Sequence, residues 1–176
     1  TIFKAVVNVA DTDRGVYLDG TLTLARHPSE TDERLMVRLL AWGLNAAPDL
    51  EFTKGLCADD EPDLWLKDLT GAIKLWIYVG QLDERWLRKA AGRAAQVVVI
   101  SYGDRVADVW WEQNRAKLEK LSNLTVLRLS SDDTQALAGL ASRSMALQCT
   151  IQDGELMITG AAGTVHVVPG PMGTAK

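Results

Sequence analysis

The stretch "AIKLWIYVG", residues 72–80, decides the fold of this chain. Its side chains are apolar on both faces of an extended strand, with Ile73, Leu75, Ile77 and Val79 on one face and Trp76 and Tyr78 on the other. Strands of this kind usually lie inside a sheet that is covered on both sides. We therefore predict that residues 73–79 form a central strand.

The sequence that follows alternates between helix and strand patterns. Residues 82–95 are typical of a helix, and "QVVVISYG" is typical of a second buried strand. The stretches "DRVADVWWEQNRAKLEKL", "NLTVLRL" and "DTQALAGLASR" continue the alternation as helix, strand and helix. Such an order predicts right-handed crossovers and a partly parallel sheet.

The two ends of the chain have a different pattern. "IFKAVVNVAD" and "VYLDGTLTLAR" alternate in polarity around the turn-forming residues 11–15, which predicts a hairpin. Residues 29–46 indicate a helix, with Ser29 as its cap and Asp32 completing a capping box. Near the other end, "MALQCTIQ", "ELMIT" and "TVHVV" predict an antiparallel meander.

These patterns predict a mixed α/β (α+β) fold. A central mixed sheet would be flanked by helices, and the N-terminal hairpin and C-terminal meander would extend or flank that core. The length of 176 residues fits one domain, which we place at residues 1–168. Residues 169–176, "PGPMGTAK", are expected to form a disordered tail.

Composition narrows the function classes. A formal net charge of −4 argues against a protein that coats nucleic acid nonspecifically, although it allows a local basic patch. The two cysteines, Cys57 and Cys149, lack the spacing of metal ligands and favour a reduced, cytoplasmic compartment. No apolar run approaches the roughly 20 residues that a membrane-spanning helix needs, so we expect no membrane partner.

An acidic cluster precedes the central strand. Asp59, Asp60, Glu61 and Asp63 surround Pro62, and such a cluster repels itself unless a cation or a helix terminus offsets the charge. One interpretation is a carboxylate site for Mg²⁺. The other is a helix start, with Pro62 at its first position and an acid as cap. The two interpretations are compatible.

A second acid, Glu33, leads an apolar stripe. Met36, Val37 and Leu40 follow it at helical spacing, so Glu33 shares their face. A carboxylate on such a face is costly to bury unless a group pairs with it. The alternative is a position at the rim, where backbone N–H groups of the first turn satisfy it.

Four cations gather on the predicted helix at residues 82–95, away from its apolar stripe: Arg85, Arg88, Lys89 and Arg93. A cationic helix face can meet the phosphates of a nucleic acid. The ordinary alternative is the solvated face of a surface helix.

Longer strings carry a family resemblance. "LTLARHPSETDERLMVRLLAW", "GLCADDEPDLWLKDLTG", "LWIYVGQLDERWLRKA" and "LQCTIQDG" resemble the YaeQ family of bacterial proteins, in order, over residues 2–159. That family is similar in fold to the PD-(D/E)XK nuclease superfamily. The resemblance therefore implies a nuclease-like core, comparable to that of restriction endonucleases.

The resemblance also implies site residues. Glu33 matches the acid of the first helix, and Asp60 matches the acid before the catalytic strand; together they would hold Mg²⁺ and approach each other at the C-terminal end of strand 73–79. The strand should then read acid-x-Lys, but this chain has Tyr78 and Gly80 at those positions. Gln81 is the nearest polar substitute for the lysine.

Two functions follow from this altered motif. The first is a nuclease-fold protein that binds nucleic acid or a protein partner in a regulatory role. The alternative is an active Mg²⁺-dependent nuclease or phosphodiesterase that uses Glu33, Asp60 and a relocated cation such as Arg88 or Lys89. Whether the chain is an enzyme is left open by its sequence.

Overall fold

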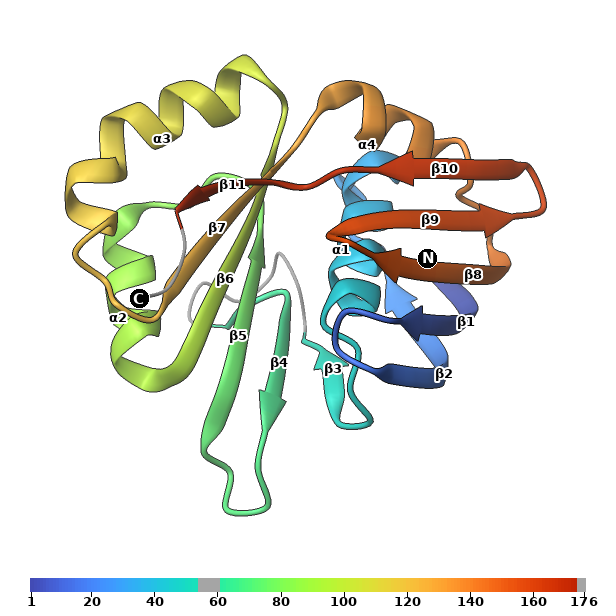
Figure 1. Ribbon diagram of the computed structural model, residues 1–176, viewed down its shortest axis with the longest axis horizontal. Coiled ribbons are helices and arrows are strands. Elements are labelled where there is room, and N and C mark those ends of the chain that lie inside the picture. Colours follow the sequence, from blue (N-terminus) through green and yellow to red (C-terminus); the bar gives the residue numbers. More distant parts are fainter. Residues whose placement is uncertain (54–60, 174–176) are drawn as a thin grey trace. The chain divides into compact units, whose positions relative to one another are not determined.

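The computed structural model describes residues 1–53 and 61–173 (Figure 1). The fold is mixed α+β, as predicted, with strands in two mixed sheets and four helices in the described part of the chain. The chain divides into two compact units, one of residues 1–50 and 132–168, the other of residues 51–131 and 169–176. The single domain expected from chain length stays a prediction.

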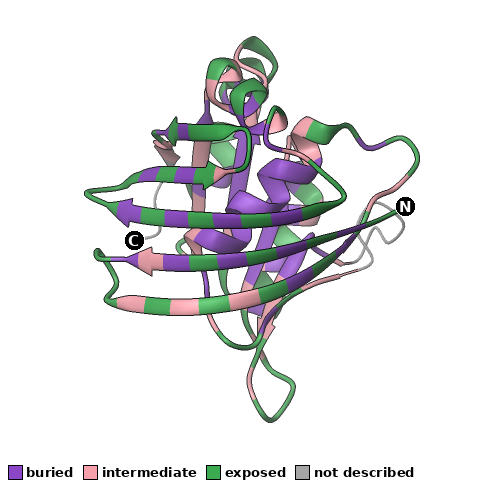
Figure 2. Ribbon diagram, turned by 90° about the vertical axis from the view of Figure 1, so that its right-hand side faces the viewer, coloured by how far each residue is buried: buried purple, intermediate pink, exposed green. Residues whose placement is uncertain are grey.

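The first unit contains a five-stranded sheet in the order β10-β9-β8-β1-β2. Its strands are β1 (Ile2–Asp11), β2 (Val16–Ala25), β8 (Ser144–Gln152), β9 (Glu155–Gly160) and β10 (Gly163–Val167). The predicted hairpin and meander are both confirmed. They join through parallel pairing of β1 with β8, so they form a sheet of their own. Figure 2 shows buried and exposed residues alternating along these strands, because one face is packed and the other is not.

Helix α1 (Asp32–Leu44) packs against β1, and every residue from 35 to 43 is buried. Its cap is Thr31, whose side chain accepts a hydrogen bond from the N–H of Arg34, so the prediction of Ser29 as cap is wrong. Ser29 bonds instead to the ring of His27. The carboxylate of Glu30, just before the helix, is buried and pairs with Arg34 and Arg38. Helix α4 (Ser131–Ala138) belongs to the same unit from residue 132 onward.

The second unit contains a six-stranded sheet in the order β11-β7-β6-β5-β4-β3. Its strands are β3 (Leu50–Phe52), β4 (Leu64–Lys67), β5 (Ile73–Val79), β6 (Ala94–Tyr102), β7 (Leu124–Leu129) and β11 (Gly170–Gly173). Strands β5, β6 and β7 are parallel to one another, while β4 and β11 are antiparallel to their neighbours. Residues 73–79 therefore form an interior strand, as predicted.

Helices α2 (Glu84–Arg93) and α3 (Arg105–Leu118) are the crossovers between these parallel strands, and both lie on one side of the sheet (Figure 1). They bury one core with the facing side chains of the strands. Its members are Trp76, Tyr78, Leu87, Ala90, Ala94, Val97, Val99, Trp110, Trp111, Leu118, Leu124 and Val126. Trp76 and Tyr78 thus face the helices. No helix in the described ranges is long and apolar enough to cross a membrane.

The structure corrects two sequence predictions. The acidic cluster does not start a helix, since residues 64–67 form the strand β4, paired with β5. The carboxylate of Asp63, one of the acids considered for capping that helix, is buried and accepts a hydrogen bond of 2.8 Å from the backbone N–H of Val79. The tail is not wholly disordered either, because residues 170–173 pair with β7. Asp59 and Asp60 lie outside the described residues.

Candidate functional site

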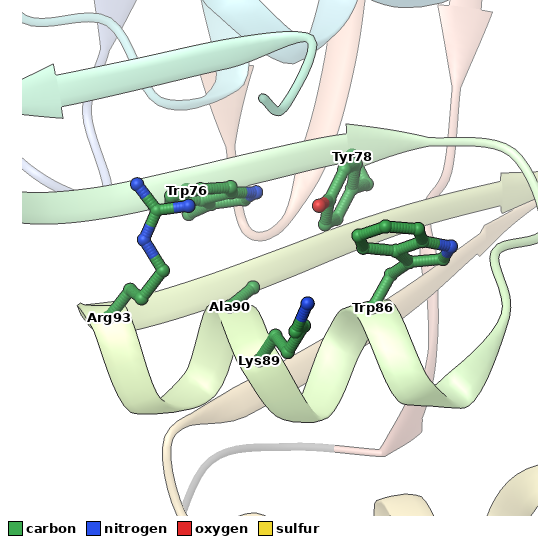
Figure 3. Close-up of a pocket in the computed structure, with 6 residues that line it drawn as sticks. All are labelled: Trp76, Tyr78, Trp86, Lys89, Ala90 and Arg93. Atoms are coloured by element: carbon green, nitrogen blue, oxygen red, sulfur yellow. The ribbon is translucent and has the colours of Figure 1, made fainter. Parts of the chain in front are cut away.

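A pocket of about 330 Å³ opens between strand β5 and helix α2 of the second unit (Figure 3). Its walls are Trp76 and Tyr78 from the strand and Trp86, Lys89, Ala90 and Arg93 from the helix. Positions 76 and 78 project to the same face of a strand, and helix positions three to four residues apart share a face. The local geometry of two elements therefore brings six side chains together.

Cations lie over aromatic rings around this pocket. The guanidinium carbon of Arg93 is 4.8 Å from the centre of the Trp76 ring, and the ammonium of Lys89 is 5.0 Å from that of Trp86. Beside them on β4, Lys67 lies 3.8 Å from the ring centre of Trp65. Each cation is attracted by the electron-rich face of its ring.

The indole N–H of Trp76 is the unusual group in the pocket. Trp76 is 1% exposed, and within the described residues its Nε1 has no hydrogen-bond partner. Figure 3 shows this nitrogen at the end of the ring nearest Tyr78. Buried donors are normally satisfied, so an unpaired one on a side chain that lines a pocket is unusual in the described part of the chain.

The predicted cationic face of α2 is partly neutralised. Arg85 bonds to Asp83, the residue that caps the helix, and Arg88 pairs with Glu84 at 2.7 Å. The hydrogen bond from Arg85 holds the pKa of Asp83 at about 2. Across the part of the chain that the structure describes, Lys89 forms no ion pair. Lys89, rather than the whole face, is therefore placed to meet an anion.

The predicted carboxylate site is not assembled by the described residues. Glu33, half-buried in the first unit, accepts a hydrogen bond of 2.8 Å from the hydroxyl of Thr134, so a side chain and not the backbone satisfies that oxygen. Asp60 lies outside the described ranges, so its predicted approach to Glu33 stays a prediction. Residues 1–53 and 61–173 contain no group of three His, Cys, Asp or Glu side chains that could hold a metal. The predicted Mg²⁺ site stays a prediction, because Asp60, one of its two carboxylates, lies outside those ranges.

The strand motif departs from a nuclease motif in backbone as well as side chain. Tyr78 is 5% exposed and lines the aromatic pocket. Gly80 has φ of +107°, a conformation that a lysine would adopt only with strain. The amide of Gln81 donates to Ser101 at 2.8 Å and to the backbone oxygen of Tyr102 at 2.5 Å. Gln81 therefore ties the end of β5 to β6, and its predicted catalytic role is untested.

Sequence reasoning overlooked Trp76 and Trp86 as pocket residues. A signal was present, since Trp86 and Ala90 are one helical turn apart, as are Lys89 and Arg93. That spacing predicts an apolar line, with Trp86 as its aromatic member, beside a cationic line on α2. It does not reveal that Ala90, the small residue between the two tryptophans, leaves the pocket open.

A family model described as YaeQ protein matches residues 1–169. The chain belongs to the YaeQ family. It is 48% identical over 167 residues to the YaeQ protein of Escherichia coli (strain K12), covering 95% of this chain and 92% of that one. All six residues of the pocket fall within the range matched by the family model.

Solved structures of YaeQ proteins share the fold. The crystal structure of YaeQ protein from Xanthomonas axonopodis pv. citri is 46% identical and superposes with a TM-score of 0.96, covering 100% of this chain and 99% of that one. The structure from Pseudomonas syringae is 34% identical, with a TM-score of 0.94 and coverage of 100% and 97%. The mixed α+β architecture is therefore that of YaeQ proteins.

Proposed function

We propose that this YaeQ protein binds single-stranded nucleic acid in a regulatory role, along helix α2, without cleaving it. The observation that carries the proposal is a set of cations held over aromatic rings: Lys89 on Trp86 and Arg93 on Trp76 at the pocket, and Lys67 on Trp65 in β4. Proteins that bind single strands combine cations for the phosphates with aromatic rings on which bases stack.

The strand motif supports binding over cleavage. A nuclease strand would direct a carboxylate and a lysine at the phosphate, whereas this strand directs Tyr78 into an aromatic pocket and has no side chain at Gly80. A neutral phenol offers little to a divalent cation, and glycine offers nothing to stabilise charge that develops on phosphate. The same positions of the fold would then serve recognition instead of chemistry.

The charge distribution predicts modest affinity. The net charge of −4 repels a polyanion, and Asp83 and Glu84 occupy two of the helix cations. Binding should therefore rest on stacking and on the two cations at the pocket, and it should weaken as salt screens them.

Fluorescence anisotropy with labelled single- and double-stranded DNA and RNA, at low salt and in EDTA, tests the proposal. We expect the single strands to bind more tightly than the duplexes. Lys89→Ala should weaken binding of all sequences and lower the slope of log affinity against log salt by about one. Lys120→Ala, which removes an exposed lysine that does not line the pocket, is the matched control for charge.

A gain of affinity provides a sharper test. Asp83→Asn keeps a residue that caps helices well and releases Arg85 from its ion pair. The variant should bind single strands more tightly than the wild type at low salt, and the gain should shrink at high salt. No binding by either protein would refute the proposal and favour a protein partner.

The other candidate function is an active nuclease. The same labelled strands distinguish it from binding without cleavage. Repeating the incubation with Mg²⁺ or Mn²⁺ should leave the strands intact under our proposal. Cleavage that is lost in both Glu33→Ala and Asp60→Ala would instead establish a metal-dependent phosphodiesterase.

A further inference from the structure

The pocket beside α2 contains a hydrogen-bond donor that nothing in the described chain satisfies. The indole N–H groups of Trp42, Trp65 and Trp110 donate to oxygens at 2.7–3.2 Å. Trp76 is more deeply buried than Trp110, yet its Nε1 has no partner. A donor that is costly to bury without a partner, on a side chain that lines a cavity, is a group that an acceptor would stabilise.

The walls of the pocket suit a flat ring. Trp76, Tyr78 and Trp86 present aromatic surface from two elements, and Ala90 contributes only a methyl group between them (Figure 3). Planar rings stack on such surfaces in offset or tilted arrangements. The volume of about 330 Å³ lies at the lower end of the range of about 300–1,000 Å³ typical of small-molecule sites.

The mouth of the pocket suits an anion. Lys89 and Arg93 are exposed and one helical turn apart, so their charges border the same opening. A second hollow of about 270 Å³, lined by Arg85, Trp86 and Lys89, adjoins the pocket and shares two of its residues. A ligand that leaves the pocket past Trp86 would therefore meet another aromatic and cationic surface.

We propose that the pocket takes one unpaired nucleobase of a single strand. The Trp76 N–H donates to a carbonyl oxygen or ring nitrogen of the base, the base stacks on Trp86, and its phosphate meets Lys89 and Arg93. The strand continues through the second hollow toward Arg85. This inference rests on the proposed function and deepens it, because a base inside a duplex cannot reach the pocket without leaving its stack.

Nitrogen-15 NMR of the indole groups tests the assignment directly. The chain has six tryptophans, so the indole region contains six signals, and the one missing in Trp76→Phe belongs to Trp76. On titration with a ten-nucleotide uridine oligomer, the Trp76 signal should move downfield as its proton enters a hydrogen bond. Uridine 5′-monophosphate should move it in the same direction, and ribose 5-phosphate, which lacks the base, should not.

Affinity measurements on variants provide the second readout. Trp86→Ala should weaken binding of the oligomer between about five-fold and 150-fold, the range measured when a stacking ring is removed. Trp76→Phe keeps an aromatic side chain and loses the donor, so a smaller loss of about five-fold is expected. Ala90→Leu narrows the pocket without removing a charge and should exclude the base; circular dichroism verifies that each variant folds.

The outcomes separate this inference from the proposed function. If the oligomer binds but the Trp76 signal stays in place and Ala90→Leu binds like the wild type, the base site is refuted while nucleic-acid binding stands. If the mononucleotide binds with the predicted shift and no oligomer binds, the base site stands and the function is refuted. If neither ligand binds, both are refuted.

Discussion

The guanidinium of Arg93 lies 4.8 Å above the ring of Trp76, while the indole N–H of the same tryptophan has no hydrogen-bond partner among the described residues. The ring face of Trp76 is thus in contact with a cation, while the N–H at the edge of the ring lacks an acceptor. The face stabilises the end of α2 against β5, and the edge leaves a donor in the pocket. The cation contact and the unpaired N–H together distinguish Trp76 from the purely apolar side chains of the neighbouring hydrophobic core.

Replacing two tryptophans by phenylalanine should have unequal effects on stability. Trp110→Phe removes a hydrogen bond of 2.7 Å to the backbone oxygen of Leu82 and leaves that oxygen unsatisfied. Trp76→Phe removes a donor that is already unsatisfied. We expect Trp110→Phe to lower the free energy of unfolding by about 1–3 kcal/mol more than Trp76→Phe does. Urea denaturation measures both, and equal losses would contradict the unsatisfied state of Trp76.

The buried carboxylate of Asp63 should be important for stability. Asp63→Ala leaves the backbone N–H of Val79 without its acceptor at the end of β5, and we expect a loss of about 1–3 kcal/mol. The control is Asp49→Ala, an exposed acid in the first unit, which should change stability by less than about 0.5 kcal/mol. If Asp63→Ala leaves the free energy of unfolding unchanged, the hydrogen bond between Asp63 and Val79 does not stabilise the sheet.

Two glycines should respond to alanine in opposite directions. A Cβ at Gly20 would overlap the indole of Trp42, so Gly20→Ala should destabilise the first unit by about 1–3 kcal/mol. Gly92, in α2, has open space around it and lacks a positive φ, so Gly92→Ala should stabilise the protein by up to about 1 kcal/mol. Thermal unfolding reports both values; a stabilising Gly20→Ala would show that the indole can move aside.

Asp83 should titrate at unusually low pH. Its pKa lies at about 2, below the ordinary 3.8, chiefly because Arg85 donates hydrogen bonds to the carboxylate. Folding therefore favours the charged form, so the contribution to stability is complete above about pH 4 and is lost as pH falls toward 2. Carbon-13 NMR of the carboxyl group should place its midpoint well below that of Asp83 in Arg85→Ala. If Asp83 titrates with the same midpoint in the wild type and in Arg85→Ala, the Asp83–Arg85 ion pair does not lower its pKa.

Cys149 should be inert in the folded protein. Burial raises the pKa of its thiol to about 11, with Asp11 adding to the effect, so almost no thiolate is present at neutral pH. In Cys57→Ser, where Cys149 is the remaining cysteine, a disulfide reagent should react slowly at pH 7 and at once after denaturation. Fast reaction of the native variant would show that the thiol is reached without unfolding.

Most elements of the fold are local properties of the sequence. Residues 73–79 are apolar on both faces and therefore require cover on both, wherever the rest of the chain lies. The hairpin around residues 11–15 and the helices at 32–44 and 84–93 follow from polarity patterns repeated over a few residues. The sequence determined these elements because alternation with a period of two or of 3.6 residues is decided by neighbours.

Other features depended on residues far apart in the chain. Residues 64–67, with acids and a proline before them, resemble a helix start, but Trp65 pairs with Trp76 and the segment is a strand. Glycines and a proline at 170–173 suggest disorder, yet they pair with β7. Cross-strand hydrogen bonds override local preference in both cases, and only the tertiary structure supplies the partner.

The candidate site divides in the same way. Sequence alone identified the cations of α2, because residue types and helical spacing are visible in it, while the comparison of Tyr78 with an acid came from the family resemblance. It could not show that Arg85 and Arg88 are paired while Lys89 lacks an ion pair in the described chain, nor that the Trp76 N–H is buried without an acceptor. Those facts depend on which atoms meet when β5 and α2 pack, and only the three-dimensional arrangement decides that.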